Sequence, residues 1–179
     1  MDRTDQELIA GVLAGEQDGY AELVRRHHAR VMGVCLSMLG DAASAEDAAQ
    51  DCFLKAYRSL ADFQGQAAFG TWLYRIAANR CLDLLRRRTR RAEDPLEAAA
   101  GAPEAGRDAS EEKELVARTL ARMPEEYRLI LTLREIEGLS YTDLTEVLDC
   151  SLDAVKARLR RARRSFCEES RHFSGSRSV

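Results

Sequence analysis

The stretch Glu137-Gly-Leu-Ser-Tyr-Thr-Asp-Leu-Thr-Glu-Val-Leu-Asp-Cys-Ser-Leu-Asp-Ala-Val-Lys-Ala-Arg-Leu-Arg-Arg-Ala-Arg-Arg164 decides the architecture of the C-terminal part of the chain. It predicts two short helices joined by a tight turn. The hydroxyl of Ser140 can cap the first helix, and Asp143 three residues later completes a capping box. Asp149 stands at the turn, where an aspartate tolerates left-handed backbone. Ser151 can then cap the second helix.

The second of these helices has an apolar stripe and a dense basic face. Val155, Leu159, Ala162 and Phe166 recur at helical spacing and are expected to face the core. Residues 152–164 contain six Lys and Arg against a single acidic residue, and phosphate is the partner that suits such a helix best. A charge run alone is also typical of a solvated surface helix. Together, the two capped helices favour a helix-turn-helix that enters a DNA groove.

The composition is that of a globular helical protein. The chain has 179 residues, of which 45% are hydrophobic and 32% charged. Its three prolines, Pro95, Pro103 and Pro124, fall between helical patterns, which favours an all-α fold. We expect no membrane insertion, because no apolar run is long enough to cross a bilayer. We expect a cytoplasmic location, because the first residues lack the pattern of a signal peptide.

The net charge of −3 conceals two basic patches. Residues 1–91 carry a net charge of +1, residues 92–114 of −6 and residues 115–179 of +2. Arginine is concentrated at 86–91 and 158–164, so the bulk charge does not exclude a nucleic-acid partner.

The acidic middle of the chain predicts a linker between two helical domains. It is small, polar and punctuated by Pro and Gly, with almost nothing to bury. Fully extended, it would span roughly 63 Å. The chain is therefore divided into an N-terminal domain (1–91), a flexible acidic linker (92–110), a C-terminal domain with the helix-turn-helix (111–170) and a polar tail (171–179).

Four amphipathic helices are expected in the N-terminal domain, at residues 5–15, 20–39, 45–61 and 71–88. The third is expected to bury Phe53, Leu54, Tyr57 and Leu60. The inner stripe expected for the fourth is Trp72, Leu73, Ile76, Ala77 and Leu84. Its expected outer face is Arg75, Asn79, Asp83 and Arg86.

Four motifs follow one another along the chain, the last of them within the stretch already described. They are Ala45-Glu-Asp-Ala-Ala-Gln-Asp-Cys-Phe-Leu-Lys-Ala-Tyr-Arg58, Phe69-Gly-Thr-Trp-Leu-Tyr-Arg-Ile-Ala-Ala-Asn-Arg-Cys-Leu-Asp83, Met123-Pro-Glu-Glu-Tyr-Arg128 and Gly138-Leu-Ser-Tyr141. In this order they resemble the extracytoplasmic-function (ECF) group of bacterial RNA polymerase sigma factors, and the resemblance covers about residues 5–167. It implies a subunit that binds core RNA polymerase and directs initiation at specific promoters.

The resemblance implies surfaces for core RNA polymerase. On the third helix, a patch of acidic, amide and apolar side chains matches the part of the family that docks on the coiled coil of the polymerase clamp. Its residues are Glu46, Asp47, Gln50, Asp51 and Leu54. Asp51 stands where the family more often has Glu. In the C-terminal domain, Glu125, Glu126 and Arg128 open a helix and either contact the polymerase flap or cap and solvate that helix.

The resemblance also implies a pocket for a base flipped out of the melted non-template strand. Loop 63–68 matches this pocket, with Phe63 as a stacking wall, Gly65 as adaptable backbone and Asn79 as an amide for a base edge. Phosphates of this downstream promoter element would be held by Arg75, Arg80 and Arg86, with Arg87 and Arg88. The alternatives are a core Phe63 and a merely solvated Asn79. Trp72 is either a core residue or a wedge that opens the strands.

The second helix of the helix-turn-helix matches family positions that face the upstream promoter element in the major groove. These residues are Lys156, Ala157, Arg160, Arg161 and Arg164. Arginine suits guanine edges and phosphates alike, so no base is assigned. The acidic linker would, by resemblance, thread the channel later occupied by RNA.

No catalytic set, metal site or cofactor site is expected. The histidines are scattered, and the five cysteines show neither a CxxC pair nor zinc-finger spacing. In a cytoplasmic chain they are expected to be reduced packing residues. One alternative is that Cys167 and His172 form half of a metal or redox sensor.

The leading hypothesis is a sigma factor for a stress or envelope response, held under control by an anti-sigma factor. Its partners would be core RNA polymerase and promoter DNA, both as duplex and as melted non-template strand. One rival is a free-standing helix-turn-helix regulator whose N-terminal domain senses a ligand or dimerises. Another is a scaffold that binds only protein.

Overall fold

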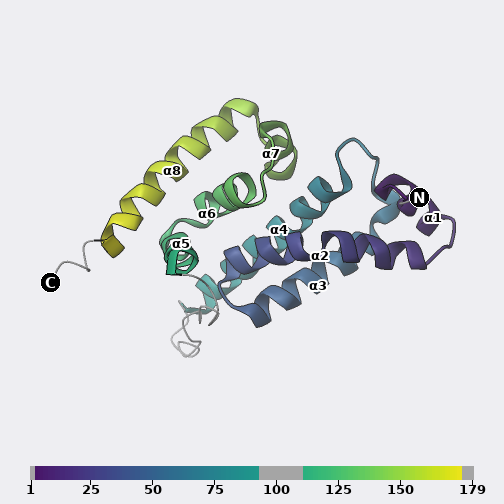
Figure 1. Cartoon of the computed structure of the whole chain (residues 1–179), viewed down its shortest axis with the longest axis horizontal. Helices are drawn as coiled ribbons and strands as arrows, with labels where there is room; N and C mark the ends of the chain where they lie inside the picture. Colours follow the sequence, from purple (N-terminus) through teal and green to yellow (C-terminus); the bar gives the residue numbers. More distant parts are fainter. Residues whose placement is uncertain (1–2, 93–110, 175–179) are drawn as a thin grey trace.

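The computed structural model describes residues 3–92 and 111–174, and within these ranges every regular element is a helix, which confirms the all-α prediction. Figure 1 shows two groups of helices lying against one another. The N-terminal unit contains α1 (Asp5–Leu13), α2 (Asp18–Leu39), α3 (Ala42–Arg58), the 3₁₀ turn η1 (Leu60–Asp62) and α4 (Phe69–Ala92). The C-terminal unit contains α5 (Glu111–Arg122), α6 (Glu125–Leu131), the π-helical turn η2 (Thr132–Ile136), α7 (Tyr141–Leu148) and α8 (Leu152–Ser174).

The predicted domain limits fall partly outside the described residues. Most of the expected linker, residues 93–110, is not described, so its role as a flexible tether stays a prediction. Helix α8 continues to Ser174, four residues into the segment 171–179 that was expected to be a polar tail. Among the described helices, none combines the length and the apolar character needed to cross a bilayer.

Helices α2, α3 and α4 pack around the core of the N-terminal unit. The inner face of α3 is built mainly from small side chains, which let neighbouring helices approach closely. They are Ala45, Ala48, Ala49, Cys52 and Ala56. Phe53 and Leu60 are buried as expected, but the inward positions predicted for Leu54 and Tyr57 are wrong: these side chains are 55% and 46% exposed. The alanine face and Phe53 are turned to the core, while Leu54 and Tyr57 point to the outside.

The third helix begins three residues earlier than predicted because the sequence at its start supplies its own stop and start signals. Gly40 has a left-handed backbone (φ 80°) and ends α2. Asp41 follows in extended backbone, and its carboxylate accepts the N–H of Ser44 at 2.7 Å. This cap starts α3 at Ala42.

The capped helix-turn-helix is confirmed. The Ser140 hydroxyl accepts the N–H of Asp143 at 3.0 Å, and the Asp143 carboxylate accepts the N–H of Ser140 at 3.1 Å. Asp149 has the left-handed backbone expected of it (φ 48°). The Ser151 hydroxyl accepts the N–H of Ala154 at 3.2 Å. Of the four residues expected to form the inner stripe of the second helix, Val155, Leu159 and Ala162 are buried and Phe166 is only partly buried. Leu144 and Val147 of α7 are buried as well.

Two side-chain hydrogen bonds fasten α7 and its preceding loop to α4. The Thr71 hydroxyl donates to the Asp143 carboxylate at 3.1 Å. The Tyr74 hydroxyl donates to the Glu137 carboxylate at 2.8 Å. In Figure 1, α7 accordingly lies beside α4 while α8 lies on the outer side of the C-terminal unit. We expected two separate domains joined by a flexible linker, so this docking of α7 on α4 was not predicted.

Arg128 is buried, at 9% exposure, and this differs from the surface position expected for it. Its guanidinium donates to four backbone carbonyls, those of Leu120, Ala121 and Met123 around the end of α5 and that of Met38 in the last turn of α2. The last carbonyls of a helix lack intrahelical partners, and a cation suits the negative end of the helix dipole. Arg128 therefore caps one helix from each unit.

Candidate nucleic-acid interface

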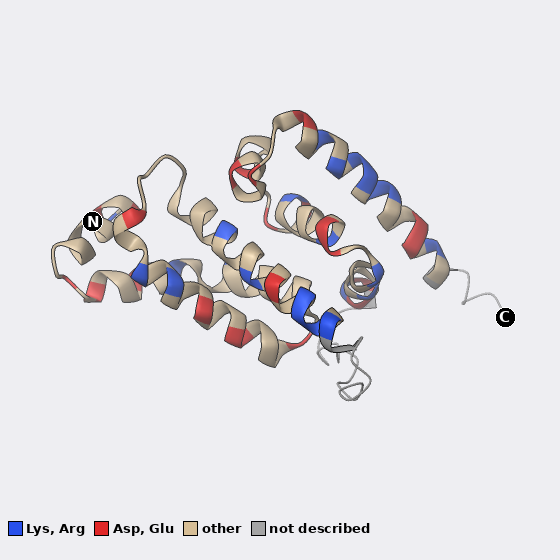
Figure 2. Ribbon diagram, turned by 180° about the vertical axis from the view of Figure 1, so that it is seen from behind, with Lys and Arg blue, Asp and Glu red and all other residues tan. Residues whose placement is uncertain are grey.

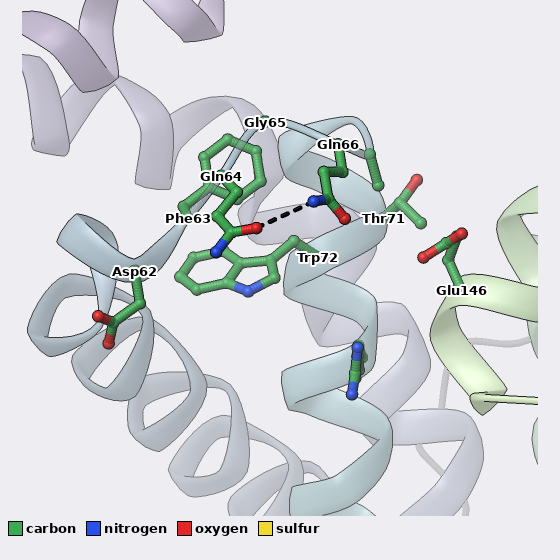
Figure 3. A pocket seen from close by; sticks show the side chains of 10 residues that line it. Asp62, Phe63, Gln64, Gly65, Gln66, Thr71, Trp72 and Glu146 are labelled. Carbon is green, nitrogen blue, oxygen red and sulfur yellow. Dashed lines mark hydrogen bonds between the residues drawn. The ribbon is translucent and has the colours of Figure 1, made fainter.

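A pocket of about 180 Å³ opens between the loop before α4 and the first turns of that helix. Figure 3 shows the side chains around it. It is lined by Asp62, Phe63, Gln64, Gly65, Gln66, Ala67, Thr71, Trp72, Arg75 and Glu146. Phe63, Gly65 and Arg75 thus come together as expected. Glu146 was missed, because it reaches the pocket from α7 and no local pattern links it to the loop.

Aromatic rings form one wall of the pocket. The ring centroids of Phe63 and Trp72 are 5.2 Å apart, and Phe69 lies 5.6 Å from each of them. Phe69 is buried, whereas Phe63 and Trp72 are half-buried and line the opening. Trp72 therefore packs against the core and also faces the pocket. Half-exposed ring faces of this kind are what a base stacks on.

The loop supplies backbone freedom and amide groups. Gly65 has φ +69°, and no atom lies within 4 Å of the place where a Cβ would stand. The need for glycine is therefore conformational rather than steric. The Gln66 amide donates to the Gln64 side-chain carbonyl at 2.9 Å, which Figure 3 marks with a dashed line. These glutamines offer donors and acceptors to a base edge, a signal that is visible in the sequence of loop 63–68 but was not among the predicted site residues.

The outer face of α4 continues from this pocket. Arg75 and Asn79 are both exposed and stand four residues apart, so they lie on one face a turn from each other. Arg75 lines the pocket, but Asn79 is not among the lining residues. The structure therefore places Asn79 one helical turn beyond the pocket and on the same face.

The remaining arginines of α4 differ in exposure and in the ion pairs that they form within the protein. Arg80 forms an ion pair with Asp51 of α3 at 2.5 Å and is only partly exposed. The sequence had assigned these two residues to separate surfaces, one for DNA and one for polymerase. Arg86 is exposed and 3.7 Å from Asp83 of its own helix, a spacing that leaves it available to phosphate.

Arg88 is committed to the fold. Its guanidinium donates to the carbonyl of Leu39 at 3.1 Å and to the carboxylate of Asp41 at 3.0 Å. Arg88 therefore joins the end of α2 to the start of α3. The run of arginines in the sequence did not predict this structural role.

The patch assigned to core polymerase lies on the outer face of α3. Glu46, Asp47 and Gln50 are exposed, Asp51 is partly exposed, and Leu54 is 55% exposed. A single exposed leucine is ordinary on a protein surface, so the assignment of this face to core polymerase stays a prediction.

Helix α8 carries the second basic surface. Figure 2 shows how closely Lys and Arg follow one another along it. Lys156, Arg160, Arg161 and Arg164 are exposed and Ala157 is partly exposed. Lys156 and Arg164 make only loose contacts with Asp153 (4.0 Å) and Glu168 (3.6 Å) on the same helix. Within the described residues, Arg160 and Arg161 form no ion pair, so both guanidiniums are available to DNA.

An apolar groove of about 550 Å³ lies on the C-terminal unit, between α5, η2 and α8. Its residues are Val116, Leu120, Leu131, Glu135, Ile136, Arg163, Phe166 and Cys167. At its edge, Arg163 donates to Glu135 at 2.8 Å. Ile136 is 52% exposed, and the sequence did not predict this surface because its residues come from separate elements.

The two side chains that form the hydrogen bonds between the units, Asp143 and Tyr74, each have one protonation state at neutral pH. Hydrogen bonds, first from the Ser140 side chain and also from Thr71, hold the pKa of the Asp143 carboxyl below its usual value. Burial, reinforced by the Glu137 carboxylate, raises the pKa of Tyr74. At neutral pH, Asp143 is therefore an ionised acceptor and Tyr74 a protonated donor.

The cysteines divide by location. Cys35, Cys52 and Cys81 are buried, and burial raises the pKa of Cys52 to about 12, so its thiol is protonated. Cys167 and His172 are both exposed on α8. Five residues turn a helix through about 140° beyond one full turn, so the two side chains lie on different sides of α8. Among the described residues, no group of three His, Cys, Asp or Glu side chains is arranged to hold a metal ion.

The two helix units coincide with two known sequence families. The model of Sigma-70 region 2 matches residues 23–91, and that of Sigma-70 region 4 matches residues 113–166. The RNA polymerase sigma-H factor of Pseudomonas aeruginosa is 38% identical over 173 residues, covering 89% of this chain and 90% of that protein. The ECF RNA polymerase sigma-E factor of Escherichia coli strain K12 is 37% identical over 174 residues, covering 89% and 91%.

Solved structures agree with this assignment. CnrH, solved in complex with the cytosolic domain of CnrY, has a TM-score of 0.71 and 30% identity, covering 92% of this chain and 95% of that one. The sigma factor RpoE of Bartonella quintana, solved with the anti-sigma factor NepR, has a TM-score of 0.73 at 20% identity, covering 84% and 95%, and shares the fold. The chain therefore belongs to the ECF group of RNA polymerase sigma factors, with a sigma-70 region 2 in its N-terminal unit and a region 4 in its C-terminal unit.

Proposed function

We propose that this chain is a promoter-specificity subunit that binds core RNA polymerase and reads two promoter elements with two different surfaces. The observation that carries the proposal is the pairing of those surfaces in one chain. The aromatic and amide pocket with the outer face of α4 suits a melted strand, because it offers stacking and base-edge hydrogen bonds. The exposed arginines of α8, in a capped helix-turn-helix, suit the major groove of duplex DNA.

The protein partners follow from the remaining surfaces. The α3 patch would meet the clamp coiled coil of core polymerase, and the apolar groove of the C-terminal unit would receive the polymerase flap. An anti-sigma factor is the proposed regulator, supported by the sigma factor RpoE of Bartonella quintana, which shares this fold and was solved with the anti-sigma factor NepR. We place this role in the cytoplasm, in response to stress or envelope damage, and assign recognition rather than catalysis to the chain.

Run-off transcription on a genomic library tests the proposal. Purified chain added to core RNA polymerase is expected to yield transcripts from a small set of start sites, with weak DNA binding by the chain alone. Start-site mapping would identify the shared promoter. Tight binding to an operator without polymerase, with no new transcripts, would instead support a free-standing helix-turn-helix regulator.

Replacing Leu54 by Ala is expected to weaken binding to core polymerase about tenfold, because an exposed anchor in a protein interface contributes on the order of 1–2 kcal/mol. Leu54 is 55% exposed, so the stability of the free chain is expected to stay unchanged. Titration of labelled chain with core polymerase measures the effect. Leu36→Ala is the matched control, since Leu36 is also exposed (44%) but lies on α2. Equal affinities of the two variants would contradict the assignment of the patch.

Replacing Asn79 by Ala is expected to impair use of the downstream element while leaving core binding intact. Loss of a hydrogen bond to a base edge removes about 1–3 kcal/mol of discrimination, so promoter preference should fall about tenfold. Transcription from promoters varied at single downstream positions measures this change. Gln6→Ala removes an exposed amide from α1 and serves as control. An unchanged promoter preference would show that Asn79 is a solvated residue that does not contact the base.

A further inference from the structure

The loop that lines the α4 pocket runs between two elements, and α1 is connected to both of them. Loop 63–68 leaves the turn η1 and enters α4 at Phe69. Helix α1 packs on α2 and on η1, with Leu8 and Ile9 buried. It contains none of the residues assigned so far to DNA or to core polymerase. Because α1 lies next to the element that precedes the loop, its side chains can influence the shape of the pocket.

His27 of α2 connects α1 to the start of α4. Its Nε2 lies 2.7 Å from a carboxylate oxygen of Asp5, the first residue of α1. An ionised carboxylate only accepts hydrogen bonds, so Nε2 is the donor. The His27 side chain is only 15% exposed. This bond therefore fixes the orientation of an imidazole ring that lies mostly inside the protein.

The imidazole ring supports the aromatic wall of the pocket. It meets the ring of Phe69 edge-on, with the centroids 5.4 Å apart. Phe69 in turn packs against Phe63 and Trp72, the two rings that line the pocket in Figure 3, at 5.6 Å from each. A Cβ placed on Gly70 would stand 3.4 Å from the imidazole, so the backbone of the first turn of α4 also lies against His27. His27 therefore backs both pocket rings through Phe69.

The carboxylate of Asp5 is itself held by two donors. One oxygen accepts from His27, and the other accepts from Arg26 at 3.2 Å. Arg26 also donates to the carbonyl of Arg3 at 2.7 Å and to the carboxylate of Glu22 at 2.7 Å. Because each oxygen of Asp5 has its own partner, the carboxylate cannot turn away from His27 without losing a hydrogen bond.

We infer that Asp5 and His27 are positioning residues of the downstream promoter pocket: through Phe69 they hold the two stacking rings in the arrangement that a flipped base needs. The inference rests on the proposed function, since it takes this pocket to be the site of the base. Hydrogen bonds to a base edge need a narrow range of distances and angles. A base that rests on a wall free to shift is therefore read less sharply, although neither Asp5 nor His27 contacts the DNA.

Asp5→Ala and His27→Ala break this series of contacts at two places. Asp5→Asn keeps a side-chain oxygen that can accept from the imidazole and loses only the ion pair with Arg26. It is the conservative variant that is expected to behave like the unmodified chain. Glu16→Ala is the matched control, because Glu16 is another carboxylate next to α1 but accepts from Arg3 rather than from His27.

The fluorescence of Trp72 reports on the wall directly, because the chain contains a single Trp. In Asp5→Ala and His27→Ala, quenching by acrylamide is expected to increase and the emission maximum to move to longer wavelength, since the indole becomes more accessible to water. Asp5→Asn and Glu16→Ala are expected to match the unmodified chain. Circular dichroism checks that all five proteins are folded. Identical Trp72 spectra and quenching in all of them would overturn the inference.

Transcription with core polymerase measures the effect on base reading. The readout is the ratio of transcripts from the best and the worst base at each downstream position, and this ratio does not depend on how much of the protein is folded. In Asp5→Ala and His27→Ala it is expected to fall about tenfold, or by about 1.4 kcal/mol, with the upstream preference unchanged. A purely structural role would lower all transcripts alike and leave the ratio unchanged, and that result would overturn the inference.

The same assay separates the positioning role from the proposed function. If the unmodified chain directs promoter-specific transcripts with a downstream preference, the proposed function stands whatever the variants do. If it directs none, the proposed function fails and the positioning role fails with it. A reduced downstream ratio together with altered Trp72 fluorescence, both restored in Asp5→Asn, supports both.

Discussion

Transcription from the chain's own promoter is expected to fall about 100-fold when Arg160 and Arg161 are both replaced by Ala. Both side chains are exposed on α8 in the second helix of the helix-turn-helix. A well-placed arginine contact to a base is worth about 1–3 kcal/mol, and two modest contacts together give about two factors of ten. The buried stripe of α8 is untouched, so the variant is expected to fold normally.

Two further measurements sharpen this test. If the arginines hold phosphates, the slope of log affinity against log salt should decrease by about one for each arginine replaced. If they read bases, the effect should be confined to promoters with particular upstream positions. Arg171→Ala, at an exposed position near the end of α8, is the control. A double variant that transcribes as well as this control would remove α8 as the upstream reader.

Arg128→Met is expected to lower the free energy of unfolding by on the order of 3 kcal/mol, and the melting temperature by about 10 °C. Methionine fills much of the same volume but leaves the carbonyls of Leu120, Ala121, Met123 and Met38 without their donor. Buried carbonyls that lose their partner carry the cost of desolvation. Urea denaturation followed by circular dichroism measures the change.

Two variants calibrate that result. Arg128→Lys keeps the charge but cannot reach four carbonyls in the planar geometry of a guanidinium, so an intermediate destabilisation is expected. Arg87→Met, at an exposed position of α4, is expected to change stability by less than about 0.5 kcal/mol. A destabilisation by Arg128→Met no larger than that by Arg87→Met would show that the buried guanidinium does not hold the helix ends.

Local chemistry was enough to predict the helices and the helix-turn-helix. Ser140 and Asp143 form the capping box at the start of α7, and Asp149 ends that helix with its left-handed backbone. These signals involve residues close together in the chain, so they can be recognised in the sequence. The inner face of α8 followed from helical spacing in the same way. The residues of loop 63–68 were predicted to line a pocket, and Phe63 and Gly65 do so.

Prediction was less successful where a residue's partner lies far along the chain. Leu54 and Arg80 illustrate the two directions of error: one apolar side chain expected inside is exposed on α3, and one arginine expected to be free is paired with Asp51. Helical periodicity gives the face of a residue but not what stands opposite that face, because the opposite element comes from another part of the sequence.

By itself, the sequence determined the all-α class, the capped helix-turn-helix, the basic face of α8 and the family, because these depend on neighbours within a turn or two and on motifs in order. Only the tertiary structure decided that the two units dock, that Arg128 caps helices of both, and that Glu146 borders the pocket of α4. The hydrogen bonds responsible join residues 63, 72 and 90 positions apart. Bonds over such distances depend on how whole helices pack, and the packing is a property of the folded chain.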